Sequence, residues 1–269
     1  MTKELAANLE AAIVLAGRFI VTEAARIEVL PGTLPGEDNP HTNLDRETDA
    51  LLHHTLLACF PVGRQPAYLT EELADDPIRL ESDQVLIVDP IDGTRSLMKK
   101  HPEAAVSVAL WRRGAGLVWG CVHNPFLPLT VSAIKGQGVL VNGRPSGVSN
   151  RSDPKECRLV MSRFETETGR LKALDGIADY YAQGSIANKM AHIACGLADA
   201  TLTINPRSEW DLAAGTILIT EAGGIVTDQM GQALSFNQPI LEMNGLVATN
   251  GHLHEWVLGL AEILRGAGD

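Results

Sequence analysis

The sequence has few cysteines and no cysteine motif. Its four cysteines stand far apart, and no two of them form a C-x-x-C pair; they are Cys59, Cys121, Cys157 and Cys195. Disulfide frameworks and zinc sites need cysteines at close, paired spacings. We therefore expect reduced thiols in the core of the protein rather than disulfide bonds or a zinc site.

Long apolar runs and an excess of positive charge are also absent. No uninterrupted apolar stretch reaches the ~18 residues of a membrane-spanning helix, and no basic segment followed by an apolar run resembles a signal peptide. With 22 basic and 33 acidic residues, the formal net charge is −11. That charge disfavours nonspecific binding to nucleic acid and to anionic membranes. We expect a soluble, cytoplasmic protein with neither as a partner.

The hydrophobic pattern of the first 150 residues predicts two helices followed by a sheet. Apolar residues recur at three-to-four spacing over residues 3–28, and a second helix is expected over residues 42–60. Apolar or alternating runs then predict strands at residues 85–89, 104–111, 116–123, 129–134 and 138–141. The Asn142-Gly143 pair that follows is typical of a tight hairpin. Strands so close together predict an antiparallel sheet.

From about residue 151 the pattern changes to alternating strands and helices. Helices are expected at residues 164–176, 186–198, 211–222 and 252–265, with strands at 158–162 and 200–204 among them. This alternation predicts an α/β second lobe over 151–269 after an α+β first lobe over 1–150. At 269 residues and 45% hydrophobic content, the chain can bury a large core as one domain or as two fused lobes.

The most informative segment covers residues 85–94 (VLIVDPIDGT), where an apolar strand runs into two carboxylates. The turn presents Asp89 and Asp92 together and places the amides of Gly93 and Thr94 at the start of the next segment. Carboxylates suit a hard cation such as Mg²⁺, and amides at a helix start suit a phosphate. The alternative is an ordinary surface turn, because Asp and Pro are common turn formers.

Two further acidic motifs favour the first interpretation. Residues 70–73 (TEEL) lie upstream, and residues 209–215 (EWDLAAG) and 221–224 (EAGG) lie far downstream. Together, in this order, the motifs resemble those of the inositol monophosphatase superfamily of Mg²⁺-dependent, lithium-sensitive phosphatases. That superfamily includes the 3′(2′),5′-bisphosphate nucleotidases and, more distantly, the fructose-1,6-bisphosphatases. The resemblance covers nearly the whole chain and implies an α+β fold with α-β-α-β-α layers, a site between the lobes and a homodimer.

The resemblance also implies a set of metal ligands. Asp89, Asp92 and the main-chain carbonyl of Ile91 would bind Mg²⁺ together with Glu71, and Asp211 would add a ligand from the second lobe. On the order of two or three Mg²⁺ ions are implied, which would acidify a bound water and neutralise the reacting oxygens. An aspartate at the start of a helix is also a common capping residue, which is the alternative for Asp211.

Three side chains are implied in catalysis. Glu71 would orient the attacking water as well as bind metal, and Thr94 is similar to the family's water-activating threonine. Asp45 resembles an acidic position near the metals, although an acidic residue in the first turn of a helix is also favoured by the helix dipole. Glu72 is either on a solvated face or an outer helper of the site. The amides of Gly93 and Thr94 would hold the phosphate.

The substrate must be inferred from the remaining pocket residues. Arg95 and Lys189 stand where the nucleotidases carry lysines, and Glu209 echoes some bisphosphate nucleotidases. Gly184 and Ser185, in the same segment as Lys189, are expected at the substrate. Two added positive charges suit a second phosphate, which inositol monophosphate does not have.

Residues 203–207 (TINPR) contain no acid to bind the ring hydroxyls of an inositol. We therefore favour a 3′(2′),5′-bisphosphate nucleotidase that releases phosphate from adenosine 3′,5′-bisphosphate. Because lysines and arginines on helices are usually solvated, a phosphatase for inositol monophosphate or a related sugar phosphate is the alternative. A protein of another class, a catalytically silent nucleotide-binding protein, is disfavoured because all the implied ligands are present.

Overall fold

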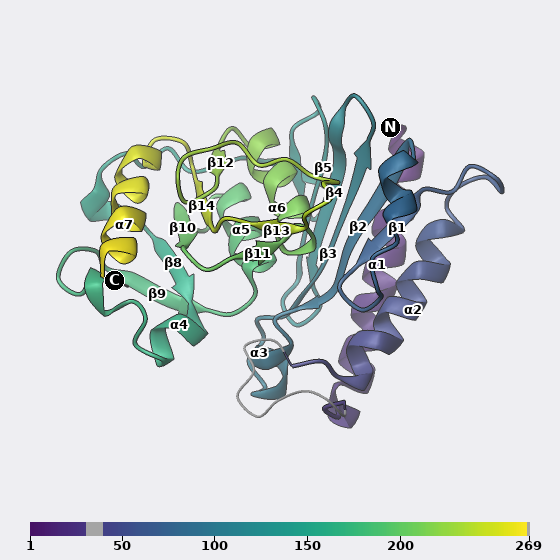
Figure 1. The fold of residues 1–269 in the computed structure, drawn as a ribbon, viewed down its shortest axis with the longest axis horizontal. Coiled ribbons are helices and arrows are strands. Elements are labelled where there is room, and N and C mark those ends of the chain that lie inside the picture. Colours follow the sequence, from purple (N-terminus) through teal and green to yellow (C-terminus); the bar gives the residue numbers. More distant parts are fainter. Residues whose placement is uncertain (31–39, 268–269) are drawn as a thin grey trace.

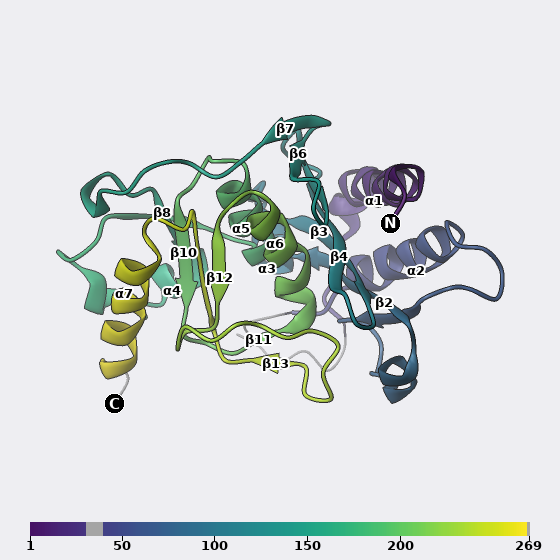
Figure 2. The same cartoon turned by 90° about the horizontal axis from the view of Figure 1, so that it is seen from above.

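The computed structural model describes residues 1–30 and 40–267, which form five layers (Figure 1). Helices α1 and α2 cover one face of a seven-stranded sheet, and α5 and α6 fill the space between that sheet and a five-stranded sheet. Helix α7 covers the outer face of the second sheet (Figure 2). The α+β fold with α-β-α-β-α layers, expected from the sequence, is confirmed.

The seven strands of the first sheet follow one another in chain order, and all neighbours are antiparallel except the first pair. The strands are β1 (Ala67–Thr70), β2 (Gln84–Asp92), β3 (Ala105–Arg112), β4 (Gly116–Asn124), β5 (Leu129–Ile134), β6 (Val139–Val141) and β7 (Arg144–Ser146). Asn142 and Gly143 form the tight turn between β6 and β7, with φ of 48° and 76°. Strand β1, which the sequence did not predict, adds a parallel edge to the predicted antiparallel sheet.

The second sheet has the order β12-β14-β10-β8-β9, and a short pair, β11 with β13, lies beside it. These strands are β8 (Leu159–Ser162), β9 (Tyr180–Gln183), β10 (Ala200–Thr203), β11 (Arg207–Ser208), β12 (Ile225–Thr227), β13 (Glu242–Met243) and β14 (Leu246–Thr249). Strand β10 is parallel to β8 and antiparallel to β14, so the sheet is mixed. The division of the chain near residue 150 stays a prediction.

Seven α-helices are described, of which α3 and α4 are single short turns. They are α1 (Lys3–Glu23), α2 (Asn43–Leu57), α3 (Thr94–Met98), α4 (Arg163–Glu167), α5 (Ile186–Ala194), α6 (Glu209–Glu221) and α7 (His254–Gly266). Short 3-10 turns add η1 (Ala24–Arg26), η2 (Pro77–Glu81), η3 (Pro154–Glu156) and η4 (Lys172–Leu174). The helix predicted over residues 164–176 is therefore broken into α4 and η4, with Gly169 at a φ of 74° between them.

Helix α1 is apolar because it belongs to the core. Together with η1 it is long and apolar enough to cross a membrane by length and composition alone, and 39% of its apolar window is buried in the protein. Leu9, Ile13 and Ile20 are at most 1% exposed and pack with α2 and the first sheet. The same composition is found in buried helices of globular proteins.

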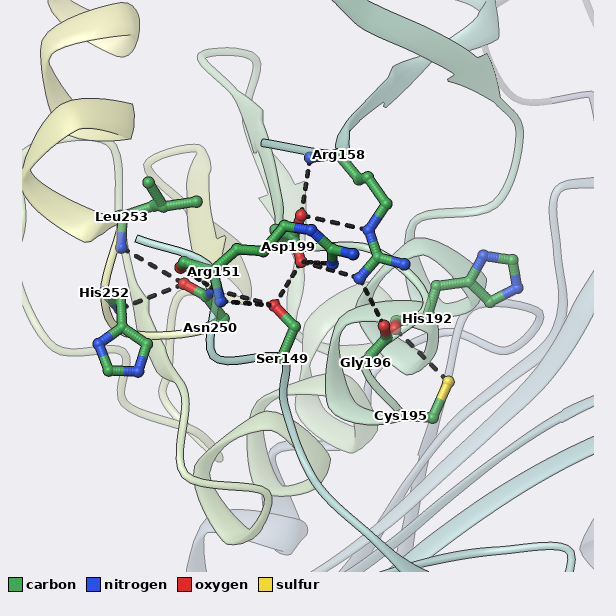
Figure 3. Close-up of polar contacts among 10 residues, drawn as sticks. All are labelled: Ser149, Arg151, Arg158, His192, Cys195, Gly196, Asp199, Asn250, His252 and Leu253. Carbon is green, nitrogen blue, oxygen red and sulfur yellow. Dashed lines mark hydrogen bonds and ion pairs between the residues drawn. The ribbon is translucent and has the colours of Figure 1, made fainter. Parts of the chain in front are cut away.

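A buried aspartate fastens the segment between the two sheets (Figure 3). Asp199 is 0% exposed, and its two oxygens accept hydrogen bonds from the Arg158 guanidinium, the Arg158 N–H and the Ser149 hydroxyl. Asn250 in turn donates to Ser149 Oγ at 3.0 Å. Burial opposes ionisation, but the hydrogen bonds from Arg158 and Ser149 outweigh it and lower the pKa of Asp199 below its usual 3.8.

We predict that Asp199→Asn lowers the free energy of unfolding by about 1–3 kcal/mol at pH 7, because the Arg158 guanidinium loses its charged partner. A carboxylate with a lowered native pKa stabilises the fold above its unfolded pKa, and that contribution is lost as pH falls through the native value. The gap between wild type and variant should therefore shrink below about pH 4. Urea unfolding of wild type and variant at pH 7 and below about pH 4 measures this difference in the free energy of unfolding. An equal difference at the two pH values would contradict the charge argument.

Candidate active site

A cavity of about 480 Å³ opens between the first sheet and the second half of the chain. Strand β2 brings Asp89 and Asp92 to it, and a shift of register between them bends the strand end toward the cavity. Gly93 follows with a φ of 101°, and a Cβ there would lie 2.8 Å from the Glu103 carbonyl oxygen. The turn between β2 and α3 therefore needs glycine at this position.

The residues implied by sequence are brought together here. Those that line the cavity are Glu71, Asp89, Ile91, Asp92, Gly93, Thr94, Arg95, Gly184, Ser185, Lys189 and Asp211. They come from the end of β1, the β2–α3 turn, the start of α5 and the start of α6. Glu209, which sequence placed at the substrate, is not among them.

Asp92 joins the first sheet to the start of α5. Its Oδ2 accepts hydrogen bonds from Ser185 Oγ at 2.7 Å and from the Ala187 N–H at 2.5 Å. Ser185 Oγ also accepts from the Asn188 N–H at 3.0 Å, so this hydroxyl caps α5 while it holds the carboxylate. Ser185 adopts an unusual φ of 59° to do so. Oδ2 of Asp92 is therefore fixed by the protein.

Asp45 caps α2 and reaches Thr94 at the same time. Its Oδ2 accepts from the Thr42 N–H at 3.0 Å, and its Oδ1 accepts from Thr94 Oγ1 at 2.7 Å. Thr94 Oγ1 also lies 2.9 Å from the Ile91 carbonyl oxygen. Asp45 is 4% exposed and does not line the cavity; it contacts Thr94, and its charge helps to raise the pKa values of Glu71 and Asp89.

Asp211 has a comparable place at α6. Its Oδ2 accepts a hydrogen bond from the Ser208 N–H at 2.9 Å, which is half of a capping box. Unlike Asp45, Asp211 also lines the cavity. The capping role and the position at the site, which the sequence left as alternatives, occur together in one side chain.

Burial and mutual repulsion raise the pKa values of the carboxyl groups in the cavity. The pKa values of Glu71 and Asp89 lie well above the usual range, and burial is the largest cause for both. The negative charges of neighbouring carboxylates raise both pKa values further. Burial and the charge of Asp92 raise the pKa of Asp211 from 3.8 to about 6. Without a cation, these groups resist ionising together.

The oxygen donors fit a hard cation. Asp89 is 1% exposed, and its Oδ1 has no hydrogen-bond partner in the described part of the chain. A buried carboxylate oxygen without a partner is costly unless it binds a proton or a metal. Within residues 1–30 and 40–267, no group of three or more acidic, histidine or cysteine side chains is placed so that it could hold a metal ion without moving. The carboxylates share a cavity, and a cation would supply the charge that draws them together.

A second side of the cavity is basic. Lys189 on α5 is 5% exposed, and burial lowers its pKa to about 8 despite the attraction of Glu165 and Asp92. Arg207 Nε is buried without a hydrogen-bond partner among the described residues, and Arg207 Nη2 lies 3.9 Å from Glu165 Oε1. The sequence reading noted residues 203–207 only for their lack of an acid and therefore missed Arg207.

The mouth of the cavity is built by α3 and α4. The guanidinium of Arg95 lies 4.1 Å from the ring centroid of Phe164, and that of Arg170 lies 4.9 Å from it. Lys99 and Glu167 form an ion pair at 2.6 Å between the same two helices. Phe164 and Arg170 carried no motif, so sequence reasoning missed them.

Two acidic residues lie away from the cavity. The expected substrate contact of Glu209 is wrong, because this side chain is 0% exposed and accepts from the N–H groups of Asn237 and Gln238 at 2.6 and 2.7 Å. Glu72 is not on a solvated face, since its side chain is 3% exposed and its Oε1 lies 3.2 Å from His41 Nδ1.

Comparisons with known proteins agree with this geometry. The model of the inositol monophosphatase family matches residues 2–265. Inositol monophosphatase 2 of Solanum lycopersicum is 30% identical over 228 residues, which cover 80% of this chain and 82% of that protein. The fructose-1,6-bisphosphatase/inositol-1-monophosphatase of Thermotoga maritima is 31% identical over a match that covers 77% of this chain and 78% of that protein. The crystal structure of the extragenic suppressor protein suhB from Bartonella henselae superposes with a TM-score of 0.78 at 28% identity. The match covers 94% of this chain and 95% of that one.

The family model matches almost the full chain, and the acidic motifs found in the sequence line one cavity. The chain belongs to the inositol monophosphatase family and is a metal-dependent phosphatase of the kind that generally uses Mg²⁺.

Proposed function

We propose that the protein hydrolyses a small phosphomonoester that carries a second phosphate, most simply adenosine 3′,5′-bisphosphate. The observation that carries this proposal is the buried cation Lys189 beside Arg207 Nε, which has no partner in the described residues. Buried charges are usually paired or bound to a ligand of opposite sign. A second phosphate bound beside Lys189 and Arg207 would add negative charge to that of Asp92 and Glu165, which already attract these cations.

The acidic floor would hold Mg²⁺ through Asp89, Asp92, Glu71, Asp211 and the Ile91 carbonyl. When bound, the metal neutralises phosphate charge and lowers the pKa of water near it. Asp92 contributes its Oδ1, because Ser185 and Ala187 occupy its Oδ2.

Thr94 and Asp45 would handle the proton of the attacking water. Thr94 Oγ1 donates its own proton to Asp45 Oδ1 at 2.7 Å, so an oxygen lone pair remains to accept a proton from water. Burial raises the pKa of Asp45, which makes it a better base than an exposed aspartate. The amides of Gly93 and Thr94, at the start of α3, would hold the phosphate.

Lys189 and Arg207 would hold the second phosphate. With a pKa of about 8, Lys189 is mostly charged at neutral pH, and a bound anion would raise that pKa. Arg95, which lines the mouth of the cavity, adds positive charge near the leaving group. Together these side chains offset the net charge of −11, which otherwise repels an anionic substrate.

An inositol phosphate is the second candidate substrate. The names of the Solanum and Thermotoga relatives favour it. Inositol offers neutral hydroxyl groups, which do not need a buried cation, and Thr203–Arg207 provides no carboxylate to accept from them. We therefore rank it second, and comparison of the two substrates separates the two candidates.

Asp211→Asn should leave the fold intact and lower kcat by about 10²-fold or more, because one ligand charge is lost. An asparagine keeps an oxygen for the Ser208 N–H, so the α6 cap survives. Asp228→Asn is the matched control, because Asp228 also accepts backbone N–H groups but lies in a turn outside the cavity. Steady-state rates at saturating Mg²⁺ test it, and near-wild-type kcat for Asp211→Asn would remove its metal role.

The Mg²⁺-dependent rise in melting temperature should weaken as pH falls below about 6. In the metal-free protein, Asp211 has its pKa raised from 3.8 to about 6, so the native state takes up protons there before the unfolded chain does. The contribution of Asp211 to stability without metal is therefore present at low pH and is lost as pH rises through that pKa. Protons and Mg²⁺ compete for the same oxygens. Thermal melts with and without Mg²⁺ from pH 5 to 8 measure this, and a pH-independent shift would contradict it.

Lys189→Met should lower kcat/KM for adenosine 3′,5′-bisphosphate at least about tenfold, since a charge-assisted contact is worth about 1.5–3 kcal/mol. Activity on inositol 1-phosphate, which has no second phosphate, should change far less. Lys172→Met, at an exposed lysine, is the control. An equal loss of kcat/KM on both substrates would mean that Lys189 acts on folding or on the overall electrostatic field of the cavity. No loss on either substrate would make the inositol phosphate the favoured candidate substrate.

A further inference from the structure

We infer that a buried network running from Glu209 to Arg79 positions the metal ligand Glu71 relative to the metal ligand Asp211. The inference rests on the proposed metal-dependent reaction and adds a positioning role for residues that do not line the cavity. It also explains why Glu209 stands next to the Trp210-Asp211 motif without contacting the cavity.

Arg79 is the centre of the network. It lies in η2, within the connection that leads from Glu71 to β2, and it is only 2% exposed. Its Nε and Nη2 donate to the two oxygens of Asp75 at 2.6 and 3.0 Å. Its Nη1 donates to Asn237 Oδ1 at 2.7 Å, and Nη2 also donates to the Gln238 carbonyl at 2.8 Å. One guanidinium therefore ties its own loop to a segment almost 160 residues away.

Glu209 holds that distant segment from the other side. Its two carboxylate oxygens accept from the backbone N–H groups of Asn237 and Gln238 at 2.6 and 2.7 Å. The Glu209 N–H itself donates to the Leu241 carbonyl at 3.0 Å. Residues 237–241 are thus fixed to the first residue of α6, two positions before Asp211.

The network therefore spans the two sides of the cavity. Glu71 and Arg79 belong to one connection in the first half of the chain, and Asp211 and Glu209 belong to one helix start in the second half. Asn237 is the link between them, at 6% exposure and with a φ of 58° that favours asparagine or glycine.

A network of this kind bears on metal binding because Mg²⁺ demands near-ideal octahedral geometry. Glu71 and Asp211 also repel each other when both are charged, since the two carboxylates line the same cavity. Without a fixed separation, the metal-free carboxylates would relax apart and the cation would have to draw them back. Outer partners that orient metal ligands typically contribute about 10–100-fold in metal affinity.

Glu209→Gln tests the inference against a control in the same helix. The substitution replaces one accepting oxygen with a donor that faces a backbone N–H. Glu221, at the other end of α6, accepts from the N–H groups of Gly136 and Gly138 at 2.8 and 3.0 Å, so Glu221→Gln removes the same type of contact away from the cavity. Isothermal titration with Mg²⁺ alone, in the absence of substrate, gives the metal Kd for both variants.

We expect Glu209→Gln to raise the Mg²⁺ Kd by about tenfold and Glu221→Gln to change it less than about twofold. Thermal melts in EDTA measure how much each variant loses in stability without metal. A purely structural role would move the melting temperature of both variants and the Mg²⁺ Kd of neither. That result would overturn the inference.

Asn237→Gly separates the network from the backbone of its link. Glycine can adopt the φ of 58° and keeps the backbone N–H that donates to Glu209. It removes the side chain that accepts a hydrogen bond from Arg79. Its Mg²⁺ Kd should rise as for Glu209→Gln, and the double variant should show less than the product of the two effects. Fully multiplicative effects would mean that the two residues act separately. If the wild type bound no Mg²⁺, the proposed function itself would fail, whereas a wild-type Kd in both variants would remove only this inference.

Discussion

The repulsion among buried carboxylates in one cavity is the constraint on which the rest of the structure depends. Glu71, Asp89, Asp92 and Asp211 line one cavity, and burial raises the pKa values of all four. Acidic neighbours raise those of Glu71, Asp89 and Asp211 further, whereas the charges of Lys189 and Arg207 lower that of Asp92. Such a cluster destabilises the metal-free protein near neutral pH. In the proposed function cations complete this cluster, so stability and function are in tension at the same atoms.

Helix starts supply most of the compensation. Asp45, Asp92 and Asp211 each place one oxygen against backbone N–H groups at the start of α2, α5 or α6. Those N–H groups have no partner within the helix, and the helix dipole favours negative charge there. Asp92 and Asp211 are each oriented in this way through one oxygen and line the cavity, whereas the second oxygen of Asp45 accepts from Thr94 Oγ1.

Much of the fold and of the site was predictable from local sequence. The D-P-x-D-G-T turn has local geometric requirements, so residue types alone indicated Asp89 and Asp92, whereas Asp211 was implied by the resemblance to the family. Sequence could not choose between capping and site roles for Asp45 and Asp211, because one carboxylate has two oxygens and does both. Arg207 was missed and Glu209 was misplaced because their partners are distant in sequence, whereas Phe164 and Arg170 were missed because they carry no motif.

The most direct test of this account is to locate the cation. Crystals of the protein soaked in Mn²⁺, which takes the place of Mg²⁺ among oxygen ligands, would show it by anomalous scattering. We expect at least one strong peak inside the cavity, within coordination distance of Asp89, Asp92 and Asp211. A cavity without any anomalous peak at saturating Mn²⁺, with these carboxylates still well ordered, would contradict the claim that the fold buries its acidic side chains to bind a metal.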